Sequence, residues 1–398
     1  MVSINQDKQL EKLGDILNLQ LIITEQCNLR CRYCFEIDKG FRQMPLELAK
    51  RILEKELSRE DGPKEYQVDL SGGEPLLRFD EVKELIEYCI LNANKWHKKV
   101  YFFIGTNLTL LNSEIEQWLV ENKHRVILGI SLDGTRDAHN HYRCDSYDAV
   151  IRNLPFYKQL YPDQGVKMTI GPDTISSVYD SIRHIESLGL PSVAANVVFE
   201  PVWGDLDNKK ACLREFSHQL ELLVEHYAHN SNLKVPNLLS LPIHKIVGQN
   251  KDDPRWCGSG THMRAYDTDG RKLPCHRFSR FSTNKIYEGS KSIGPRVPTK
   301  CDQCMYVAAC PSCRGYNWQV YGNPDSRTSY HCEFIKLQML ATAKLQYLLN
   351  KSLIDNLFSG GSPPEDVPGK TTLVTLQAAN LIFNSLDEDH IIENCELG

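Results

Sequence analysis

The sequence lacks several features that would each assign the protein to a class. No apolar run approaches the roughly 20 residues of a membrane span, and the first 18 residues are too polar and charged for a signal peptide. Neither sign of charge dominates, because 46 Lys and Arg stand against 51 Asp and Glu. There is therefore no electrostatic case for nucleic acid or an anionic membrane as a partner. We expect a cytoplasmic protein.

Cysteine, by contrast, is plentiful. The chain has 14, and ten of them fall into spaced groups. A cytosolic compartment keeps thiols reduced, so such groups favour metal binding or catalysis over disulfides. The stretch CNLRCRYC places Cys27, Cys31 and Cys34 one ligand short of a tetrahedral site. Thiolates suit iron–sulfur clusters and zinc, and a four-iron cluster on three cysteines keeps one iron open. A buried cysteine stripe on a helix and a partial zinc site are the alternatives.

A strand–helix alternation from residue 19 to about 200 predicts an α/β fold. Six β-rich apolar runs are each followed by a helical pattern, which implies parallel strands with helical crossovers. Eight such units would close a full barrel, so six predict a partial (β/α)6 TIM-type barrel, open on one side. The first cysteine group follows the first strand, at the face where such barrels hold their chemistry.

The whole chain is longer than a single hydrophobic core usually serves, and changes in composition along it predict several segments. We expect an N-terminal lead, the barrel, a bridge, a cysteine-rich domain, and a C-terminal part with helices, a linker and an acidic tail. Their predicted ranges are 1–18, 19–230, 231–256, 257–334 and 335–398. The cysteine-rich range has little periodicity, so a cofactor should organise it.

Together, these motifs resemble those of radical S-adenosylmethionine (SAM) enzymes. CNLRCRYC resembles the family's CxxxCxxC motif, and SGGEP, after the second expected strand, resembles its GGE segment. The resemblance covers residues 19 to about 200. It implies that the three cysteines hold a [4Fe-4S] cluster whose fourth iron binds SAM. Reductive cleavage of SAM would then give a 5′-deoxyadenosyl radical that abstracts hydrogen.

The same resemblance suggests residues that bind SAM. Gly72 and Gly73 would let a ligand approach the backbone, and Glu74 could pair with an ammonium group. Tyr33 matches the family's aromatic position beside the adenine. The other candidates, each of which could be an ordinary polar residue, are Asn107, Ser131 and Arg143.

The second cysteine group resembles the SPASM extension, which binds two auxiliary [4Fe-4S] clusters and would raise the total to three. The motifs are CGSGTHMRAYDTDGRKLPC and CDQCMYVAACPSC. The resemblance assigns the nearer cluster to Cys257, Cys275 and Cys313. It assigns the farther cluster to Cys301, Cys304, Cys310 and Cys332. One departure is that CPSC has two intervening residues where the family has three. Alone, these motifs would favour zinc.

The nearer cluster would then have only three thiolates. Three explanations stay open: an open iron that the substrate could ligate, a distant ligand, and ligation by His262.

SPASM proteins mostly modify peptides or proteins. We therefore expect an enzyme that forms an intramolecular C–C, C–S or C–O cross-link in a ribosomally made precursor peptide, with a reducing partner such as flavodoxin or ferredoxin. Only 18 residues precede the first expected strand, so recognition should come from the barrel, the bridge, the C-terminal region or a separate protein.

Two alternatives remain, one within the enzyme class and one outside it. One is the oxidation of Cys or Ser to formylglycine, as in anaerobic sulfatase maturases. Those enzymes carry an Asp after the PC cysteine, proposed as the catalytic base, whereas this chain has His276. Its ordinary pKa near 6.5 would suit a base, although a structural histidine is the plainer interpretation. The other alternative is a metal-bearing binding module without catalysis.

Overall fold

The computed structural model describes residues 16–37, 39–248, 257–351, 354 and 370–397. Most of the expected N-terminal lead, the end of the bridge and most of the linker therefore lie outside the described residues.

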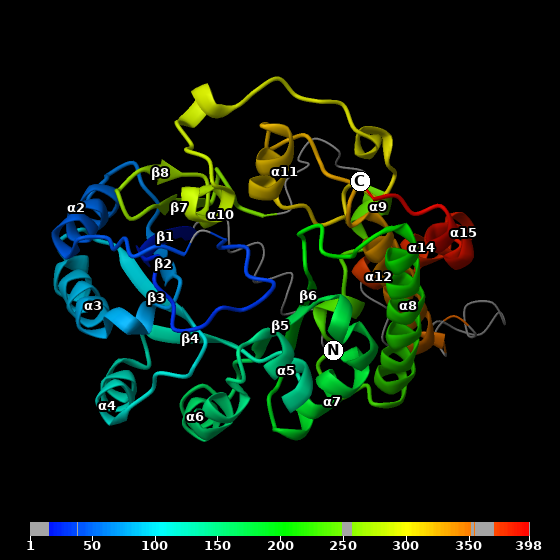
Figure 1. Cartoon of the computed structure of the whole chain (residues 1–398), viewed down its shortest axis with the longest axis horizontal. Coiled ribbons are helices and arrows are strands. Elements are labelled where there is room, and N and C mark those ends of the chain that lie inside the picture. The colour runs from blue at the N-terminus through cyan, green and yellow to red at the C-terminus, as the bar shows by residue number, and fades with distance from the viewer. Residues whose placement is uncertain (1–15, 38, 249–256, 352–353, 355–369, 398) are drawn as a thin grey trace.

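A curved sheet of eight strands, in the order β6-β5-β4-β3-β2-β1-β7-β8, is the frame of the molecule (Figure 1). Its first six strands run parallel to their neighbours. They are β1 (Ile16–Thr24), β2 (Glu65–Gly72), β3 (Lys99–Thr106), β4 (Val126–Ser131), β5 (Val166–Ile170) and β6 (Val193–Val197). This arrangement confirms the predicted α/β class and the partial barrel.

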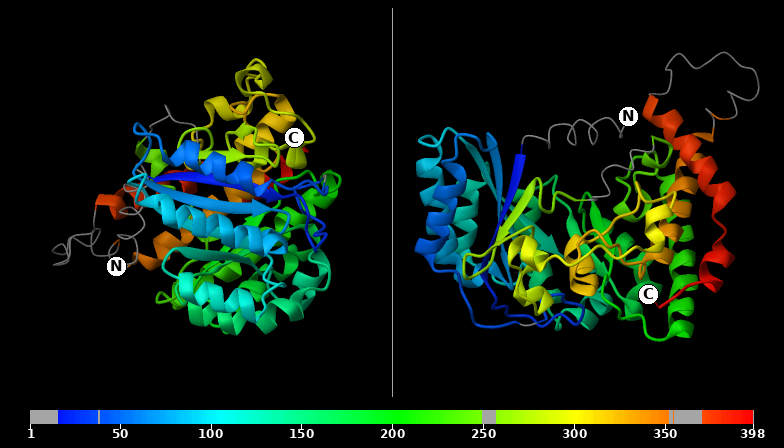
Figure 2. Two further views of the ribbon diagram at one scale, coloured as in Figure 1. Left: turned by 90° about the vertical axis from the view of Figure 1, so that its left-hand side faces the viewer. Right: turned by 90° about the horizontal axis from the view of Figure 1, so that it is seen from above.

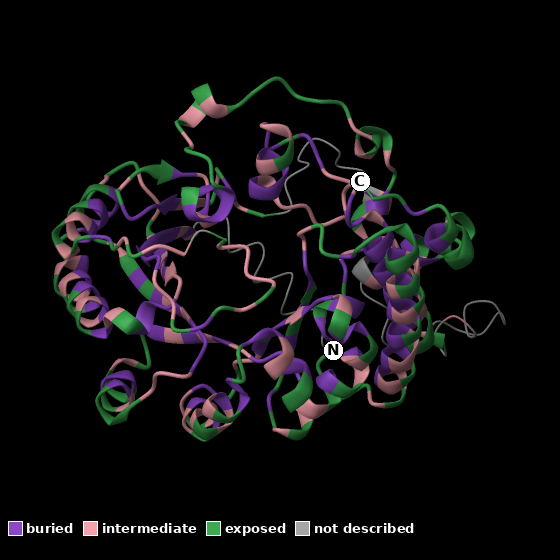
Figure 3. Ribbon diagram, in the orientation of Figure 1, coloured by how far each residue is buried: buried purple, intermediate pink, exposed green. Residues whose placement is uncertain are grey.

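Helices cover the outer face of this sheet (Figures 1 and 2). They are α2 (Leu46–Leu57), α3 (Phe79–Ala93), α4 (Ser113–Asn122), α5 (Arg136–Tyr142), α6 (Tyr147–Leu160), α7 (Val178–Ser187) and α8 (Leu206–His229). In α2, Ala49, Ile52 and Leu53 recur three and four apart and are buried. Figure 3 shows buried residues along the faces where helices meet the sheet. The asparagine side chain of Asn112 caps α4 by accepting from the N–H of Ile115.

Strand β1 begins at Ile16, three residues before the predicted start. Leu17 is buried, and Asn18 has a partner on the inner face of the sheet, because its Nδ2 donates to Oδ2 of Asp69 at 2.7 Å. The amide nitrogen of a polar residue inside the barrel thus finds its acceptor on a strand 51 positions away, which local periodicity does not show.

The cysteine-rich range contributes strands that periodicity did not indicate. Strand β7 (Met263–Tyr266) pairs parallel with β1, and β8 (Lys272–Leu273) pairs antiparallel with β7. Gly270 has a φ of +79° in the turn between them, a conformation that favours glycine. The barrel sheet is therefore extended beyond β1 by the segment that carries the second cysteine group.

The remaining helices are α9 (Lys245–Gly248), α10 (Arg280–Thr283), α11 (Arg314–Tyr321), α12 (Cys332–Leu349), α14 (Lys370–Ser385) and α15 (Glu388–Glu393). Helix α12 packs against α8 and α14 at one end of the sheet (Figure 2). Fully buried Lys209 joins α8 to the start of α12, since its Nζ donates to Glu333 at 3.0 Å and to the carbonyl of Tyr330 at 3.1 Å. No described helix combines the length and apolar character needed to cross a bilayer.

Candidate functional site

A cavity of about 340 Å³ lies inside the barrel, among the strands and the loops that follow them. The thiols of the first cysteine group, Cys27, Cys31 and Cys34, all line it. Most of the predicted SAM-binding residues line the same cavity, namely Tyr33, Gly73, Glu74, Asn107, Ser131 and Arg143. The structure therefore brings together residues that are more than 100 positions apart in the sequence.

The loop after β1 presents the three thiols. The N–H of Cys34 donates to the carbonyl of Cys31 at 3.1 Å, and Nδ2 of Asn107 donates to Oδ1 of Asn28 at 2.8 Å, which ties the loop to the end of β3. Burial raises the pKa of all three thiols, that of Cys34 to about 11. The three thiols are soft donors that share one cavity, and their raised pKa values mean that a bound metal would have to stabilise the thiolate form. Both properties fit an iron–sulfur cluster.

Gly72 and Gly73 allow a close approach of the chain to itself, and Gly73, but not Gly72, also lines the cavity. A Cβ on Gly72, which has a φ of +137°, would lie 2.0 Å from the carbonyl oxygen of Thr24. A Cβ on Gly73 would lie 2.1 Å from the carbonyl oxygen of Gln26. Only glycine lets β2 end this close to the cysteine loop.

Glu74 is buried and engaged by protein donors. Its carboxylate accepts from the N–H of Asn107 at 2.7 Å and from Oγ1 of Thr106 at 2.8 Å. Burial raises its pKa to about 7, although these hydrogen bonds act in the opposite direction. The carboxylate is therefore held in one orientation at the cavity wall.

Asp133 is a site residue that the sequence interpretation missed, although it lies in the SLDG stretch. Its Oδ2 accepts from Nε of Arg143 at 2.7 Å and from the hydroxyl of Tyr33 at 2.5 Å. The guanidinium of Arg143 also lies 5.4 Å from the centre of the Tyr33 ring. The terminal nitrogens of Arg143 make no hydrogen bond to any residue in the described part of the chain, so they can serve a ligand.

Other cavity residues were also missed because no motif marks them. They are Phe35, Glu36, Lys39, Lys167, Thr169, Asn196 and Glu200. Burial raises the pKa of Glu36 to about 8.

His276, the predicted base, is not among the residues that line the cavity. Its imidazole lies 5.6 Å from the ring of Phe35, which does line it. Its backbone N–H and its Nδ1 both lie 3.0 Å from Oε1 of Gln20. Burial, together with the nearby charges of Lys167 and Arg277, lowers the pKa of His276 to about 4. A neutral ring that donates from Nδ1 keeps Nε2 as its acceptor.

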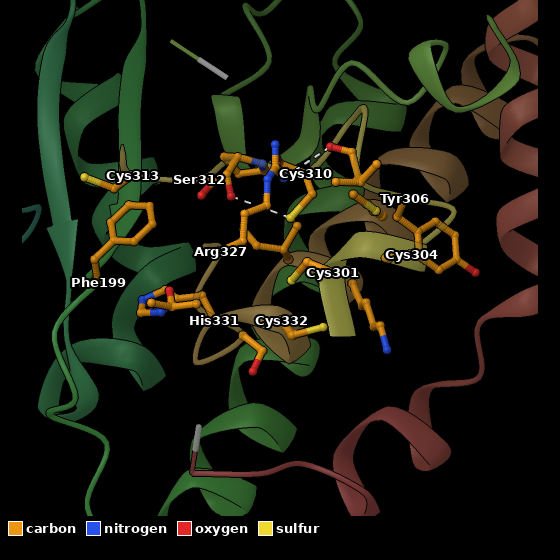
Figure 4. A pocket seen from close by; sticks show the side chains of 17 residues that line it. Phe199, Cys301, Cys304, Tyr306, Cys310, Ser312, Cys313, Arg327, His331 and Cys332 are labelled. Atoms are coloured by element: carbon orange, nitrogen blue, oxygen red, sulfur yellow. Dashed lines mark hydrogen bonds between the residues drawn. The ribbon is translucent and has the colours of Figure 1, made fainter. Parts of the chain in front are cut away.

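The remaining predicted ligands form two groups. Cys257, Cys275 and Cys313 lie close together: burial raises the pKa of Cys275 and the other two thiols add to this effect, and Cys257 also raises the pKa of Cys313. The other four cysteines line a small cavity of about 40 Å³, and Cys313 also lies on its wall (Figure 4). In that group, burial raises the pKa of Cys310 to about 12, and its three companions add to the effect. The assignment of individual cysteines to two clusters stays a prediction.

Soft thiols in both groups fit iron–sulfur clusters. Among the described residues, no three His, Cys, Asp or Glu side chains converge on a single metal ion, whereas a four-iron cluster takes each thiolate on a different iron. His262 is exposed, and no contact joins it to the three thiols of the nearer group within the described ranges.

Arg277 lies between the cavity and the nearer group. Its guanidinium is 4.5 Å from the ring centre of Phe35 and forms an ion pair with Glu200. It also lowers the pKa of Cys313. A Cβ on Gly315 would lie 2.5 Å from Cγ of Arg277, so this glycine makes room for it.

Comparison with known proteins gives a family match over residues 21–193, to the Radical SAM superfamily. The chain is 33% identical over 117 residues to the uncharacterized protein MJ0907 of Methanocaldococcus jannaschii. It is 28% identical over 178 residues to a cysteine-type anaerobic sulfatase-maturating enzyme of Clostridium novyi. These matches cover 29% and 42% of this chain, and the chain spans only 38% and 44% of the two relatives' lengths.

Two further relatives match over longer stretches. A cysteine-type anaerobic sulfatase-maturating enzyme of Clostridium perfringens (strain 13 / Type A) is 22% identical over 78% of this chain and 91% of its own length. The radical SAM cyclopropyl synthase TigE of Paramaledivibacter caminithermalis is 25% identical over 83% of this chain and 74% of its own length.

Solved structures share the fold. anSMEcpe with bound AdoMet and a Cp18Cys peptide has a TM-score of 0.61 at 19% identity, covering 87% of this chain and 99% of that chain. Streptococcus suis SuiB bound to the precursor peptide SuiA has a TM-score of 0.55 at 16% identity, covering 82% and 78%. At these identities the likeness establishes the architecture only.

Proposed function

We propose that this chain, whose residues 21–193 form a radical SAM domain, forms an intramolecular C–C, C–S or C–O cross-link in a ribosomally made precursor peptide. One observation carries the proposal. The three-thiol loop shares a single cavity with the exposed inner faces of the last two strands, where Lys167 and Asn196 are accessible. In addition, no strand pairs with β6 on its far side within the described residues. An extended peptide could lie along this open side.

The cofactors would be held by residues that are already in place. We assign the radical [4Fe-4S] cluster to Cys27, Cys31 and Cys34, and the SAM carboxylate and ammonium groups to Arg143 and Glu74. Cluster and SAM together supply the hydrogen-abstracting radical when bound. The protein's own part is positional: Asp133 orients both Arg143 and Tyr33, and the glycines hold β2 against the cysteine loop.

A cross-link removes two hydrogens from the peptide. Accounting for their protons and electrons suggests a role for the second cysteine group. One hydrogen leaves as an atom. The other leaves as a proton and an electron, so both a proton acceptor and an electron acceptor are needed. We assign the electron to two auxiliary clusters on the seven cysteines of the second group, and the proton to His276.

The relatives support both a peptide substrate and one rival reaction. SuiB is bound to a precursor peptide, and TigE is named a cyclopropyl synthase. Conversely, the match to 91% of a cysteine-type sulfatase-maturating enzyme favours oxidation of Cys or Ser to formylglycine. We favour the cross-link because His276 stands where those enzymes carry an Asp.

The test is an anaerobic reaction with a short peptide encoded beside this protein's gene. The product should be lighter by two hydrogens per event, with one SAM consumed per cross-link. A product with a new aldehyde at Cys or Ser would establish formylglycine formation instead.

The cysteine variants control this test. Replacing Cys27, Cys31 and Cys34 together by Ala should abolish 5′-deoxyadenosine formation but leave the auxiliary iron in place. Cys212→Ala, on α8 and outside the groups, is the matched control and should retain activity. Reductive SAM cleavage by the triple variant would refute the cluster assignment.

A further inference from the structure

Lys167 is a cation on the cavity wall that the proposed chemistry does not use. It lies on β5, where Val166, Met168 and Ile170 are buried against the helices while Lys167 and Thr169 point the other way. Both of these inward residues line the cavity, and Lys167 is exposed within it. The alternation of a strand therefore places a lysine inside the barrel, where apolar residues usually pack.

Neighbouring residues define the surroundings of the Lys167 side chain. Its Nζ lies 5.2 Å from the centre of the Phe103 ring on β3, a distance at which an aromatic face attracts a cation. A Cβ on Gly129 of β4 would lie 1.9 Å from Cζ of Phe103. The glycine thus leaves room for the ring to lie across β4 toward Lys167.

The other two cations of the cavity wall have protein partners. Arg143 pairs with Asp133, and Lys39 donates to the carbonyl of Leu29 beside the thiols. The ammonium group of Lys167, in contrast, forms no hydrogen bond or ion pair with any residue in the ranges that the structure describes.

The acidic residue that acts on Lys167 is already bound elsewhere. Asp69 accepts from Nδ2 of Asn18 and from Nε2 of Gln67, each at 2.7 Å, and it forms no ion pair with Lys167. Burial lowers the pKa of Lys167, while Asp69 acts in the opposite direction. A charge that is partly removed from water without a partner is costly, and an anionic ligand would relieve this cost.

We propose that Lys167 binds a carboxylate of the peptide substrate and thereby selects an acidic side chain or a free C-terminus near the modified residue. Thr169 and Asn196 line the same wall and offer a hydroxyl and an amide to the same group. The inference rests on the proposed function, because it takes the cavity to hold a peptide. The SAM carboxylate is assigned to Arg143, which pairs with Asp133 just after the end of β4.

The test measures binding rather than turnover, so it stands whether or not cross-linking is observed. The probes are N-acetylaspartate N′-methylamide and its asparagine counterpart for a side chain, and N-acetylglycine and its amide for a C-terminus. They are titrated into the reconstituted holoenzyme with SAM by calorimetry or NMR. We expect one acid to bind roughly 10- to 100-fold more tightly than its amide, the range for a hydrogen bond to a charged group.

The variants decide between the outcomes. Lys167→Met should abolish the preference for the acid, whereas Lys99→Met should preserve it, because Lys99 lies on the exposed end of β3 and pairs with Glu65. Equal binding of acid and amide by the wild type would overturn the proposal, as would a preference that survives in Lys167→Met. If Lys167→Met instead weakens SAM binding by the same factor, Lys167 belongs to the SAM site and the proposal fails.

Discussion

The Nε atom of Arg143 lies 2.7 Å from Oδ2 of Asp133, and both side chains are buried. The same oxygen accepts from the hydroxyl of Tyr33, which belongs to the cysteine loop. One carboxylate thus positions the arginine proposed for the SAM carboxylate and the aromatic residue proposed for the adenine.

Asp133→Asn is therefore expected to weaken SAM binding. The neutral amide loses the charge that orients Arg143, so affinity should fall roughly 10- to 100-fold, as for the loss of a hydrogen bond between charged groups. Calorimetric titration of the reconstituted protein with SAM measures the change. Asp173→Asn, at an exposed contact with His141, is the control, and unchanged affinity in Asp133→Asn would remove Asp133 from the site.

The metal content of the anaerobically reconstituted protein tests the two groups of the second motif. We expect about twelve irons per chain, four for each of three clusters. Chelation should unfold residues 257–334 first, because that range has few regular elements and depends on its metal. Proteolysis during chelator treatment locates the unfolded range. One or two equivalents of zinc with only about four irons would identify a zinc fold instead.

His276→Ala tests the proton acceptor. The Gln20 contact leaves Nε2 of the imidazole free, so its removal should slow peptide turnover about 100-fold, the usual share of a general base. SAM binding should change little, because His276 does not line the cavity that holds the predicted SAM residues. Turnover that stays at the wild-type rate would mean that His276 is structural.

His139 should make the fold sensitive to acid. It is fully buried; the N–H of Asp133 donates to its Nδ1 at 3.3 Å, and its Nε2 lies 3.0 Å from Oγ of Ser146. Burial lowers its pKa to about 4. Between pH 6.5 and 4, His139 is therefore protonated in the unfolded chain but neutral in the folded chain. Because the unfolded chain binds the extra proton, the free energy of unfolding falls as the pH falls.

Between pH 7 and pH 5 this single group should account for a loss of about 2 kcal/mol. Urea unfolding of wild type and His139→Asn at both pH values measures it, and the loss should be smaller in the variant. In His229→Asn, an exposed residue at the end of α8, the wild-type loss should persist. An equal loss in wild type and His139→Asn would show that His139 is not the group responsible.

Much of the architecture could be predicted because it follows from the local periodicity of apolar residues. The alternation of strands such as β5 and the spacing of buried residues in α2 depend on neighbours only a few positions away, so six strand–helix units could be recognised. Motif spacing likewise placed the first three thiols at the end of β1. The number of clusters and the roles of individual site residues stay predictions.

What tertiary structure alone decided depends on contacts between distant segments. Strands β7 and β8 have almost no periodicity, and they become strands because β1 offers an edge on which to pair. Asp133 and Lys167 join the site because parallel strands bring their ends and inner faces to one cavity, and His276 lies outside its lining because Gln20 of β1 holds it. Hydrophobic patterning and cysteine spacing are local, so they determine the framework and the order of the candidate ligands along the chain. Hydrogen-bond partners and access to the cavity are set only when distant strands pair into one curved sheet.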